Sequence, residues 1–409
     1  MSDSEGEAPH PSTLSSAAPI AALERLALAH DEELVEFRRD LHRHPELSLA
    51  ETRTTERIAE RLAAAGLEPR LIPGSGLVCD IPGTGPEARP IIGLRADIDA
   101  LPVADEKDVP YKSTVSGVCH ACGHDVHASV LLGAGLLMKQ LADEYGLPVP
   151  VRLIFQPAEE VLRGAALMIK EGALDGVGRL LALHCDPRTE VGRVGLRSGP
   201  ITSACDLIQL TLTGPGGHSS RPHLTSDVVF AMASMVTGLP AALSRRLDPR
   251  SGTSIVWGQV EAGKAANAIP VHGFVKGTVR CTELDAWNQI PDLVRRTVDS
   301  MSDTFGVKTE LDYTRGVPPV VNDAECTELV RKAVTAVLGE GAVSQTDQSL
   351  GGEDFAWYLD HVPGAMVRLG VRPPGATHAP DLHTGAFDAD ERAIGVGARL
   401  FAAVPYMAA

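Results

Sequence analysis

The sequence predicts an α/β fold, with a mixed, mostly parallel sheet flanked by helices and a smaller α+β domain inserted into the chain. Short apolar runs alternate with stretches of helical periodicity, which is the pattern of strands covered by helices. Ionisable residues directly follow several of these runs, at the strand ends where ligands of open parallel sheets collect. Between 203 and 316 the order of elements becomes β-α-β-β-α-β, which predicts a ferredoxin-like unit.

The composition limits the possible functions. The chain has 409 residues, of which 44% are hydrophobic and 22% charged, so it can bury a sizeable core in two or three domains. A formal net charge of -16 argues against a nucleic-acid partner. The longest uninterrupted apolar runs fall short of the roughly 18 residues needed to span a bilayer, so we expect a soluble protein without a membrane partner. Seven cysteines, an odd number in a chain of this length, favour the reducing cytoplasm over a disulfide framework.

The first domain is expected to open with a helix over 20–42, because apolar residues recur there at helical spacing and His44 and Pro45 end the run. A buried strand at 91–96 delivers Asp97 at its carboxyl end. The other elements expected in this domain are helices at 49–65, 128–141 and 164–171 and strands at 68–72, 77–81, 149–155 and 180–183.

The inserted domain begins with a strand at 207–213, where apolar and polar residues alternate. The elements expected after it are a helix at 226–243, strands at 253–260 and 272–280, a helix at 284–303 and a strand at 308–313. After Pro318 a helix at 323–339, a strand at 365–369 and a last helix return to the first domain. The expected division is a disordered tail at 1–18, the first domain at 19–202 and 317–409, and the inserted domain at 203–316.

A cluster of soft and titratable side chains lies at 119–127, with the sequence CHACGHDVH. Thiolate and neutral imidazole are the donors that zinc and similar transition metals prefer. The alternatives are a redox dithiol and a helix cap with incidental histidines. The cluster precedes an apolar helical run, whose core has no use for so many titratable groups at one place.

Further donors follow the predicted strands. Glu159 and Glu160 are adjacent at a strand end, so one can bind a metal while the other faces a bound water. Taken singly, a glutamate pair or a strand-end histidine is more often structural, and their coincidence at strand ends indicates a metal site. Five donors exceed the needs of one tetrahedral zinc and suit two ions with open positions for water and substrate. The predicted metal ligands are Cys122, His124, Glu160, His184 and His383.

Over about residues 30–405, the chain resembles the dinuclear aminoacylase/carboxypeptidase metallohydrolases. The motifs that carry the resemblance are RADIDALP (95–102), HACGHDVH (120–127), FQPAEE (155–160) and GGEDF (351–355), with LHRHPE at 41–46. The branch is that of hippurate hydrolases, N-acyl-L-amino-acid amidohydrolases and plant auxin-conjugate hydrolases. The resemblance implies a zinc-exopeptidase-like fold, in which the inserted domain acts as a lid and dimerisation domain.

The resemblance also implies roles within the metal centre. Cys122 would bridge the two ions, in place of the aspartate of other branches. His124 and His184 would complete one ion, and Glu160 and His383 the other; His378 competes with His383, but the LHT sequence fits the family better. Glu159 would be the general base, and Asp97 would orient a ligand imidazole.

Four more residues are implied in substrate binding. His218 would reach across a dimer to polarise the scissile carbonyl. Asn267, in AANAIP (265–270), and Arg280 would hold the free carboxylate of the substrate, although Arg280 could instead be a surface arginine. Gly352 would let the backbone approach the substrate closely.

The predicted function is hydrolysis of the amide bond of N-acyl-L-amino acids, with acetyl, benzoyl or longer acyl groups, to a carboxylate and a free amino acid. Two divalent ions (zinc, manganese, cobalt or nickel) would activate water with Glu159 as base, in a homodimer or higher homo-oligomer. The alternative within enzymes is a dipeptidase or carboxypeptidase with the same centre. A non-catalytic binding protein would be expected to lack Glu159 or a ligand, and a thiol redox protein leaves the glutamate pair unexplained.

Overall fold

The computed structural model describes residues 17–84 and 89–408, which form two compact units. The first unit contains the described residues through Leu196 together with Asp323–Thr346 and the residues from Val362 onward. The second unit contains Arg197–Asn322 and Asp347–His361. Most of the predicted tail at 1–18 lies outside the described residues, and a helix already begins at Ala17.

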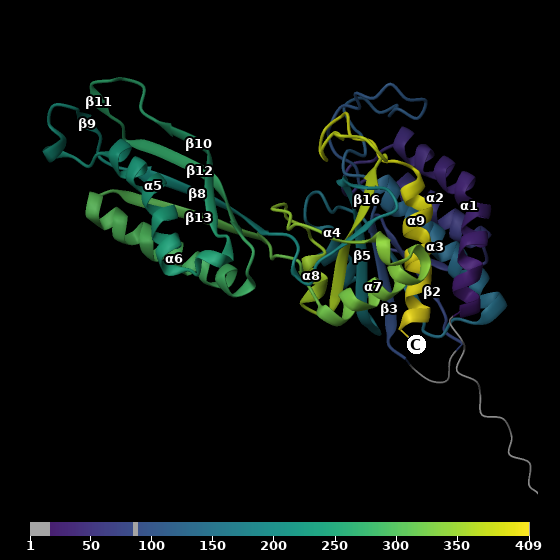
Figure 1. Cartoon of the computed structure of the whole chain (residues 1–409). Coiled ribbons are helices and arrows are strands. Elements are labelled where there is room, and N and C mark those ends of the chain that lie inside the picture. Colours follow the sequence, from purple (N-terminus) through teal and green to yellow (C-terminus); the bar gives the residue numbers. More distant parts are fainter. Residues whose placement is uncertain (1–16, 85–88, 409) are drawn as a thin grey trace, which may run out of the picture. The chain divides into compact units, whose positions relative to one another are not determined.

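The first unit is built on an eight-stranded sheet in the order β1-β2-β4-β3-β5-β16-β6-β15 (Figure 1). The neighbours β4, β3, β5 and β16 are parallel in succession, β15 is parallel to β6, and the other pairs are antiparallel. The predicted mixed, mostly parallel sheet is therefore confirmed. Its strands are β1 (Pro69–Leu71), β2 (Leu77–Ile81), β3 (Ile91–Asp97), β4 (Val151–Gln156), β5 (Val177–Glu190), β6 (Val194–Leu196), β15 (Val343–Gln345) and β16 (Gly364–Arg372).

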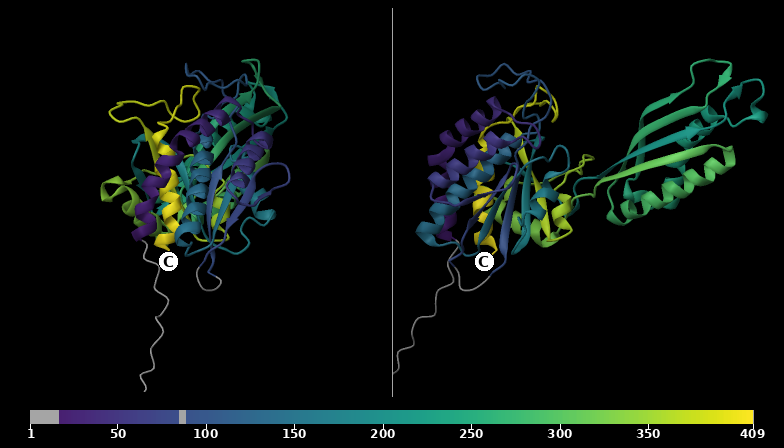
Figure 2. Two further views of the ribbon diagram at one scale, coloured as in Figure 1. Left: turned by 90° about the vertical axis from the view of Figure 1, so that its right-hand side faces the viewer. Right: turned by 180° about the vertical axis from the view of Figure 1, so that it is seen from behind.

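Helices cover this sheet. Helix α3 is buried at every position from His124 to Met138, because its sequence is apolar all round after the first turn, as in helices at the centre of a core. Helices α1 and α9 pack on α3 and on each other, and the views in Figures 1 and 2 place them on the same face of the sheet. The helices of this unit are α1 (Ala17–Arg43), α2 (Thr52–Ala64), α3 (His124–Tyr145), α4 (Gly164–Lys170), α7 (Ala324–Leu338) and α9 (Arg392–Met407).

The second unit has a four-stranded antiparallel sheet in the order β10-β12-β8-β13, with α5 and α6 packed on it. Its order along the chain is the predicted β-α-β-β-α-β of a ferredoxin-like unit. Successive positions of β8 alternate between buried and more exposed, with Ile208, Leu210 and Leu212 buried, as expected for a sheet with one face on a core. The main elements are β8 (Ala204–Thr213), α5 (Val228–Arg246), β10 (Ser254–Ala262), β12 (His272–Cys281), α6 (Leu284–Phe305) and β13 (Lys308–Val317).

Shorter elements complete both units. Two pairs of two-residue strands, β7 with β14 and β9 with β11, lie in the second unit. These short strands and the remaining helix are β7 (Gly199–Pro200), β9 (Gly217–His218), β11 (Ala268–Ile269), β14 (Val321–Asn322) and α8 (Ala356–Leu359), with 3-10 turns at Pro222–Leu224, Pro249–Ser251 and Glu340–Ala342.

Residues 347–361 belong to the second unit, although 317–409 are predicted as part of the first domain. The reason is aromatic packing: Trp357 lies edge-on to Trp287 of α6, with ring centres 6.3 Å apart. Apolar contacts of this kind between distant segments cannot be read from local periodicity.

Helix α5 is long and apolar enough to cross a membrane by length and composition. Its buried residues, among them Ala231, Met235 and Leu239, belong to the core beneath the four-stranded sheet. Core helices of globular proteins pass the same test of length and composition, so this property is weak evidence for a membrane span.

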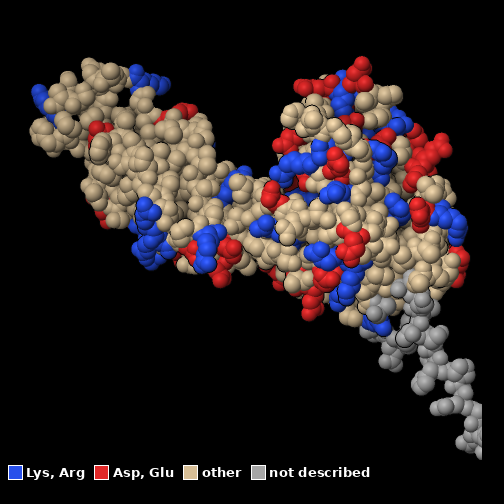
Figure 3. Space-filling model, viewed as in Figure 1, with Lys and Arg blue, Asp and Glu red and all other residues tan. Residues whose placement is uncertain are grey.

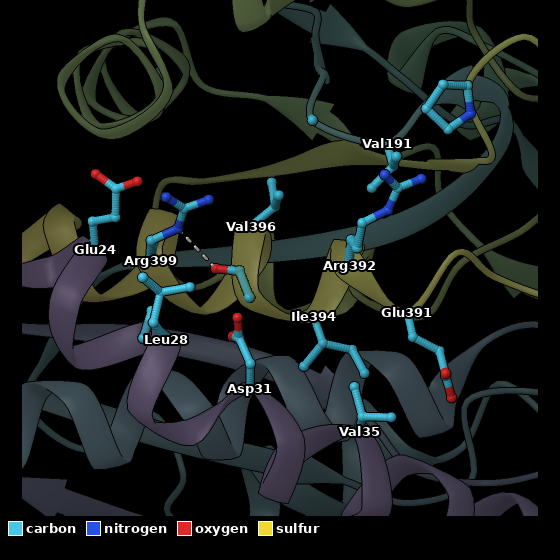
Figure 4. A pocket seen from close by; sticks show the side chains of 14 residues that line it. Glu24, Leu28, Asp31, Val35, Val191, Glu391, Arg392, Ile394, Val396 and Arg399 are labelled. Carbon is cyan, nitrogen blue, oxygen red and sulfur yellow. Dashed lines mark hydrogen bonds between the residues drawn. The ribbon is translucent and has the colours of Figure 1, made fainter.

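The surface of the first unit has a groove of about 620 Å³ between α1 and α9 (Figure 4). Leu28, Val35 and Ile394 give it an apolar lining, with charged residues such as Asp31 and Arg399 beside them. The groove contains none of the predicted site residues. On the face shown in Figure 3, acidic and basic side chains are interspersed over the first unit, and the second unit shows a broad uncharged area.

Candidate metal centre

The loop that carries Cys122 turns into α3 at Gly123. Gly123 has a φ of 86°, and a Cβ atom there would lie 2.9 Å from the sulfur of Cys185. Glycine is therefore required by both the backbone and the space. Helix α3 begins at His124, four residues before the predicted start, so His124 and His127 lie one turn apart on the same face.

The ends of neighbouring strands bring the other donors to the same edge of the sheet. Asp97 ends β3 and pairs with Gln156, which ends β4 just before Glu159 and Glu160. The prediction that His184 ends its strand is wrong, because β5 continues beside β16 to Glu190. The ladder between β3 and β5 nevertheless stops at Arg95 and Ala182, so His184 lies level with Asp97.

The predicted ligands converge in two groups. The ligand atoms of Cys122, His124 and His184 all lie within 4.8 Å of one another, and so do those of Cys122, Glu160 and His383. The sulfur of Cys122 lies 3.5 Å from Nε2 of His184. Oε1 of Glu160 lies 3.8 Å from Nε2 of His124 and 3.7 Å from Nε2 of His383. Cys122 belongs to both groups, as a bridging ligand would.

The backbone of His383 is hydrogen-bonded to the loop that carries Cys122. Its φ is 63°, and its N–H donates to the carbonyl of Ala121 at 2.8 Å. The competing His378 belongs to none of the groups of potential metal ligands found among residues 17–84 and 89–408. The geometry therefore favours His383 as the donor from this loop.

Two polar atoms at the centre of these groups have no hydrogen bond within the described chain: Nε2 of His124 and Oε1 of Glu160. Both are buried, where an unsatisfied polar atom is costly. Divalent cations would give both atoms a partner, and the set of one thiol, three imidazoles and one carboxylate suits zinc and related metals. These residues therefore fit a pair of metal ions.

Buried carboxylates orient the histidines of the site. Nδ1 of His124 contacts the backbone oxygen of Asp99 at 2.9 Å and its Oδ1 at 3.1 Å, which turns Nε2 toward the other ligands. Asp97, predicted to orient a ligand imidazole, has its Oδ2 3.7 Å from Nε2 of His124, contacts Nδ1 of His127 at 2.5 Å and accepts from Arg95 at 2.6 Å. Nε2 of His127 in turn accepts the N–H of Cys185 at 2.8 Å.

Asp99 and His127 were not among the predicted site residues. Both were visible as signals: Asp99 lies in the same motif as Asp97 and two residues later, on the same side of an extended chain. His127 follows His124 at the spacing that shares a helix face. The sequence does not tell which carboxylate contacts which imidazole ring.

Burial and neighbouring charges shift the pKa values of several predicted ligands. Burial raises the pKa of the Cys122 thiol, and the nearby Glu160 and Glu159 add to this shift. Burial also raises the pKa of Glu160, against the opposing charges of His124 and His383. Burial lowers the pKa of His184 well below its ordinary value, aided by Arg368, so this ring is neutral and able to ligate. Burial alone would lower the pKa of His124, but the charge of Asp97 raises it well above its ordinary value, so metal binding would displace protons from the thiol and from this ring.

The four residues predicted from the second unit form two separate groups. His218 pairs with Ala268 across the short β9–β11 ladder, next to Asn267, and both side chains are exposed. Arg280 donates to the carbonyl of Leu350. A Cβ on Gly352 would lie 3.1 Å from the Cβ of Cys205. Cys205 of β8 lies opposite Arg280 of β12 in the sheet, so Gly352 and Arg280 lie near each other.

These two groups lie at opposite ends of β12. Arg280 is eight residues beyond His272, about 27 Å at the usual rise per residue, and Asn267 precedes His272. Within one copy of the second unit, Asn267 and Arg280 therefore lie far apart, and their joint contact with the substrate carboxylate stays a prediction.

Comparisons with known proteins identify the family. The chain is 35% identical over 376 residues to N-acetylcysteine deacetylase of Bacillus subtilis, covering 91% of this chain and 96% of that protein. The crystal structure of a dinuclear metal-binding M20 peptidase from Bacillus subtilis has a TM-score of 0.81 and 32% identity, covering 93% of this chain and 99% of that one. A longer Rhodococcus jostii protein that carries the name of a glutamate–cysteine ligase is 48% identical over 376 residues, 91% of this chain and 46% of that protein.

The last relative shows that the chain spans about half the length of one protein that it matches. Residues 93–406 match the model of Peptidase family M20/M25/M40. The predicted relationship to dinuclear metallohydrolases is thereby confirmed. The chain is a hydrolase of the M20/M25/M40 peptidase family.

Proposed function

We propose that this protein hydrolyses the amide bond of N-acyl-L-amino acids to a carboxylate and a free amino acid. The observation that carries the proposal is the pair of ligand groups that share Cys122, with Glu159 beside them in a further cluster with His124 and Glu160. A related protein, N-acetylcysteine deacetylase, is named for a small N-acyl substrate.

Cys122, His124, His184, Glu160 and His383 would hold the ions. Two divalent ions would supply positive charge that lowers the pKa of a bound water and stabilises negative charge on the substrate oxygen. Zinc, manganese, cobalt and nickel are all compatible with these donors. Glu159 is only 6% exposed and would take the proton of the attacking water and return it to the leaving amine.

The second unit would supply substrate contacts. Arg280 would bind the free carboxylate with its guanidinium fork, and Gly352 would let the backbone come close to the substrate. His218 and Asn267 would act from a second copy of the chain, which makes a homodimer the smallest active form. All seven cysteines are free of disulfides, which supports the reducing cytoplasm as the compartment.

A peptidase with the same centre is the second candidate, because the family and one similar structure are named as peptidases. The two candidates differ in the substrate's amino end: a dipeptide presents an ammonium group where an N-acyl amino acid presents an apolar acyl group. Protein loaded with each metal in turn should be assayed on N-acetyl- and N-benzoyl-amino acids and on unblocked dipeptides. We expect faster hydrolysis of the N-acyl compounds; preferred cleavage of dipeptides, or no cleavage with two ions bound, would contradict the proposal.

A further inference from the structure

The loop between β4 and α4 carries Glu159 and Glu160 on an unusual backbone. Ala158 and Leu162 have φ values of 55° and 57°, in the left-handed region that non-glycine residues rarely adopt. Such conformations cost free energy and persist where the surroundings hold them. The groups that hold this loop therefore also set the position of the candidate base.

Two buried carboxylates from other segments accept hydrogen bonds from the backbone on either side of Glu159. The N–H of Ala158 donates to Oε1 of Glu51 at 2.8 Å, and the N–H of Glu160 donates to Oδ2 of Asp99 at 3.0 Å. The glutamate between them is thus fixed from both neighbours. Asp99 also orients His124, whereas Glu51 contacts none of the predicted metal ligands through a hydrogen bond described here.

Glu51 is fully buried and its second oxygen, Oε2, accepts from the hydroxyl of Ser75 at 2.7 Å. It stands at the N-cap position of α2 but its side chain caps no amide of that helix. No ion pair of Glu51 with lysine or arginine occurs in the described parts of the chain. Burial raises the pKa of Glu51, against the hydrogen bonds from Ser75 and Ala158. A carboxyl group in such a place is costly for stability, which points to another role.

We infer that Glu51 is a positioning residue, whose side chain holds the Ala158 amide so that Glu159 stays beside the candidate metal ligands. The effect of Glu51 on the reaction rests on the proposed function, whereas the positioning of the loop by Glu51 rests on the hydrogen bonds alone. Reaction rates depend strongly on such placement: a displacement of about 1 Å can cost about 100-fold.

Two substitutions distinguish the effect of the side-chain length of Glu51 from the effect of its charge. Glu51→Gln keeps an oxygen acceptor at the same distance and can donate to the Ser75 hydroxyl, but removes the charge. Glu51→Asp keeps the charge and withdraws the acceptor by one methylene group. Thr54→Ala is the control, because Thr54 is also fully buried on α2 and its hydroxyl makes no hydrogen bond within the described chain.

Hydrogen–deuterium exchange of the metal-free protein tests the hold on the loop without any activity. We expect the peptide spanning 157–164 to exchange faster in Glu51→Asp than in the wild type, and to be unchanged in Glu51→Gln and Thr54→Ala. Unchanged exchange in Glu51→Asp would overturn the inference.

Steady-state kinetics of the metal-loaded variants test the consequence for the reaction. We expect kcat of Glu51→Asp to fall about 10- to 100-fold, with KM within about twofold and two ions still bound. Glu51→Gln should stay within about threefold of wild type, since one neutral hydrogen bond replaces a charged one. Equal impairment of both variants would overturn the inference. A wild type that cleaves no N-acyl amino acid would refute the proposed function, and the exchange data would still decide whether Glu51 holds the loop.

Discussion

At the scale of single residues, two adjacent glutamates face different partners. Oε1 of Glu160 points at His124 and His383, and the backbone N–H groups on either side of the Glu159 side chain, those of Ala158 and Glu160, donate to Glu51 and Asp99. Since one side chain would bind metal and the other would move a proton, substituting the first should lower the metal content and substituting the second should lower kcat.

We predict that Glu159→Ala lowers kcat by at least about 10²–10⁴-fold, the usual contribution of a general base, while two ions stay bound. Glu160→Ala should instead lose metal. Metal content and kcat measured on the same samples check both. Loss of an ion from Glu159→Ala with retention in Glu160→Ala would mean that the two roles are exchanged.

Asp99 provides a second prediction at this scale. Asp99→Ala removes the carboxylate contact with Nδ1 of His124 and leaves only the contact with the backbone oxygen, so it is expected to weaken metal binding about 10- to 100-fold. Ser48→Ala is the matched control, because the Ser48 hydroxyl donates to the other oxygen, Oδ2, at 2.6 Å and leaves the histidine contact in place. Competition with a chelating dye measures both affinities. Equal affinity of Asp99→Ala and the wild type would contradict this role.

At the scale of elements, a buried charge network joins α1 to the first turn of α3. Nε of Arg38 donates to Asp125 at 2.7 Å, and Nδ1 of His42 contacts the same oxygen at 2.7 Å. Nε2 of His42 lies 3.2 Å from Asp105. Asp125 directly follows His124, so this network fixes the helix end that carries a predicted ligand.

The network predicts how stability changes with pH. Burial alone would lower the pKa of His42, but Asp125 and Asp105 raise it above 6.5. Protonated His42 therefore stabilises the fold fully below the unfolded pKa of about 6.5, and this contribution is lost as pH rises through the higher folded value. In urea unfolding, the free-energy difference between wild type and His42→Asn should be larger at pH 6 than at pH 9. A difference that is constant or grows with pH would contradict a charged His42.

Local patterns predicted the elements well where the chain is regular. The strand at 77–81 has the predicted bounds, and β3 extends the predicted 91–96 by one residue, because apolar runs between turns leave little choice. The start of α3 was placed too late, since its first turn is made of polar candidate ligands that hide the helical period. The three-residue strands β6 and β15 were missed, because so short a strand is defined by its partners and carries no period of its own.

At the scale of the whole molecule, the two-unit plan and the family motifs were predictable from order and spacing along the chain. The assignment of 347–361 to the second unit was not, because it depends on the packing of Trp357 against Trp287. The candidate ligands were all named from sequence, whereas the contact of Asp99 with Nδ1 of His124 depends on distances that only a folded chain defines.

The separation of His218 from Arg280 leads to a prediction about subunits. If the two residues serve one substrate, they must come from different copies of the chain. His218→Ala and Glu159→Ala should each be nearly inactive, and mixing them under conditions of subunit exchange should restore part of the activity, up to about a quarter if one site in four is intact. Activity in the mixture no higher than the sum of the separate variants would contradict a site completed in trans.

The central claim is that distant segments of the chain bind two cations around one sulfur atom. A crystal structure of the zinc-loaded protein, with anomalous scattering recorded at the zinc edge, tests this directly. We expect two anomalous peaks, each about 2.3 Å from the sulfur of Cys122, one near His124 and His184 and the other near Glu160 and His383. A single peak, or peaks that do not share Cys122, would contradict the dinuclear centre.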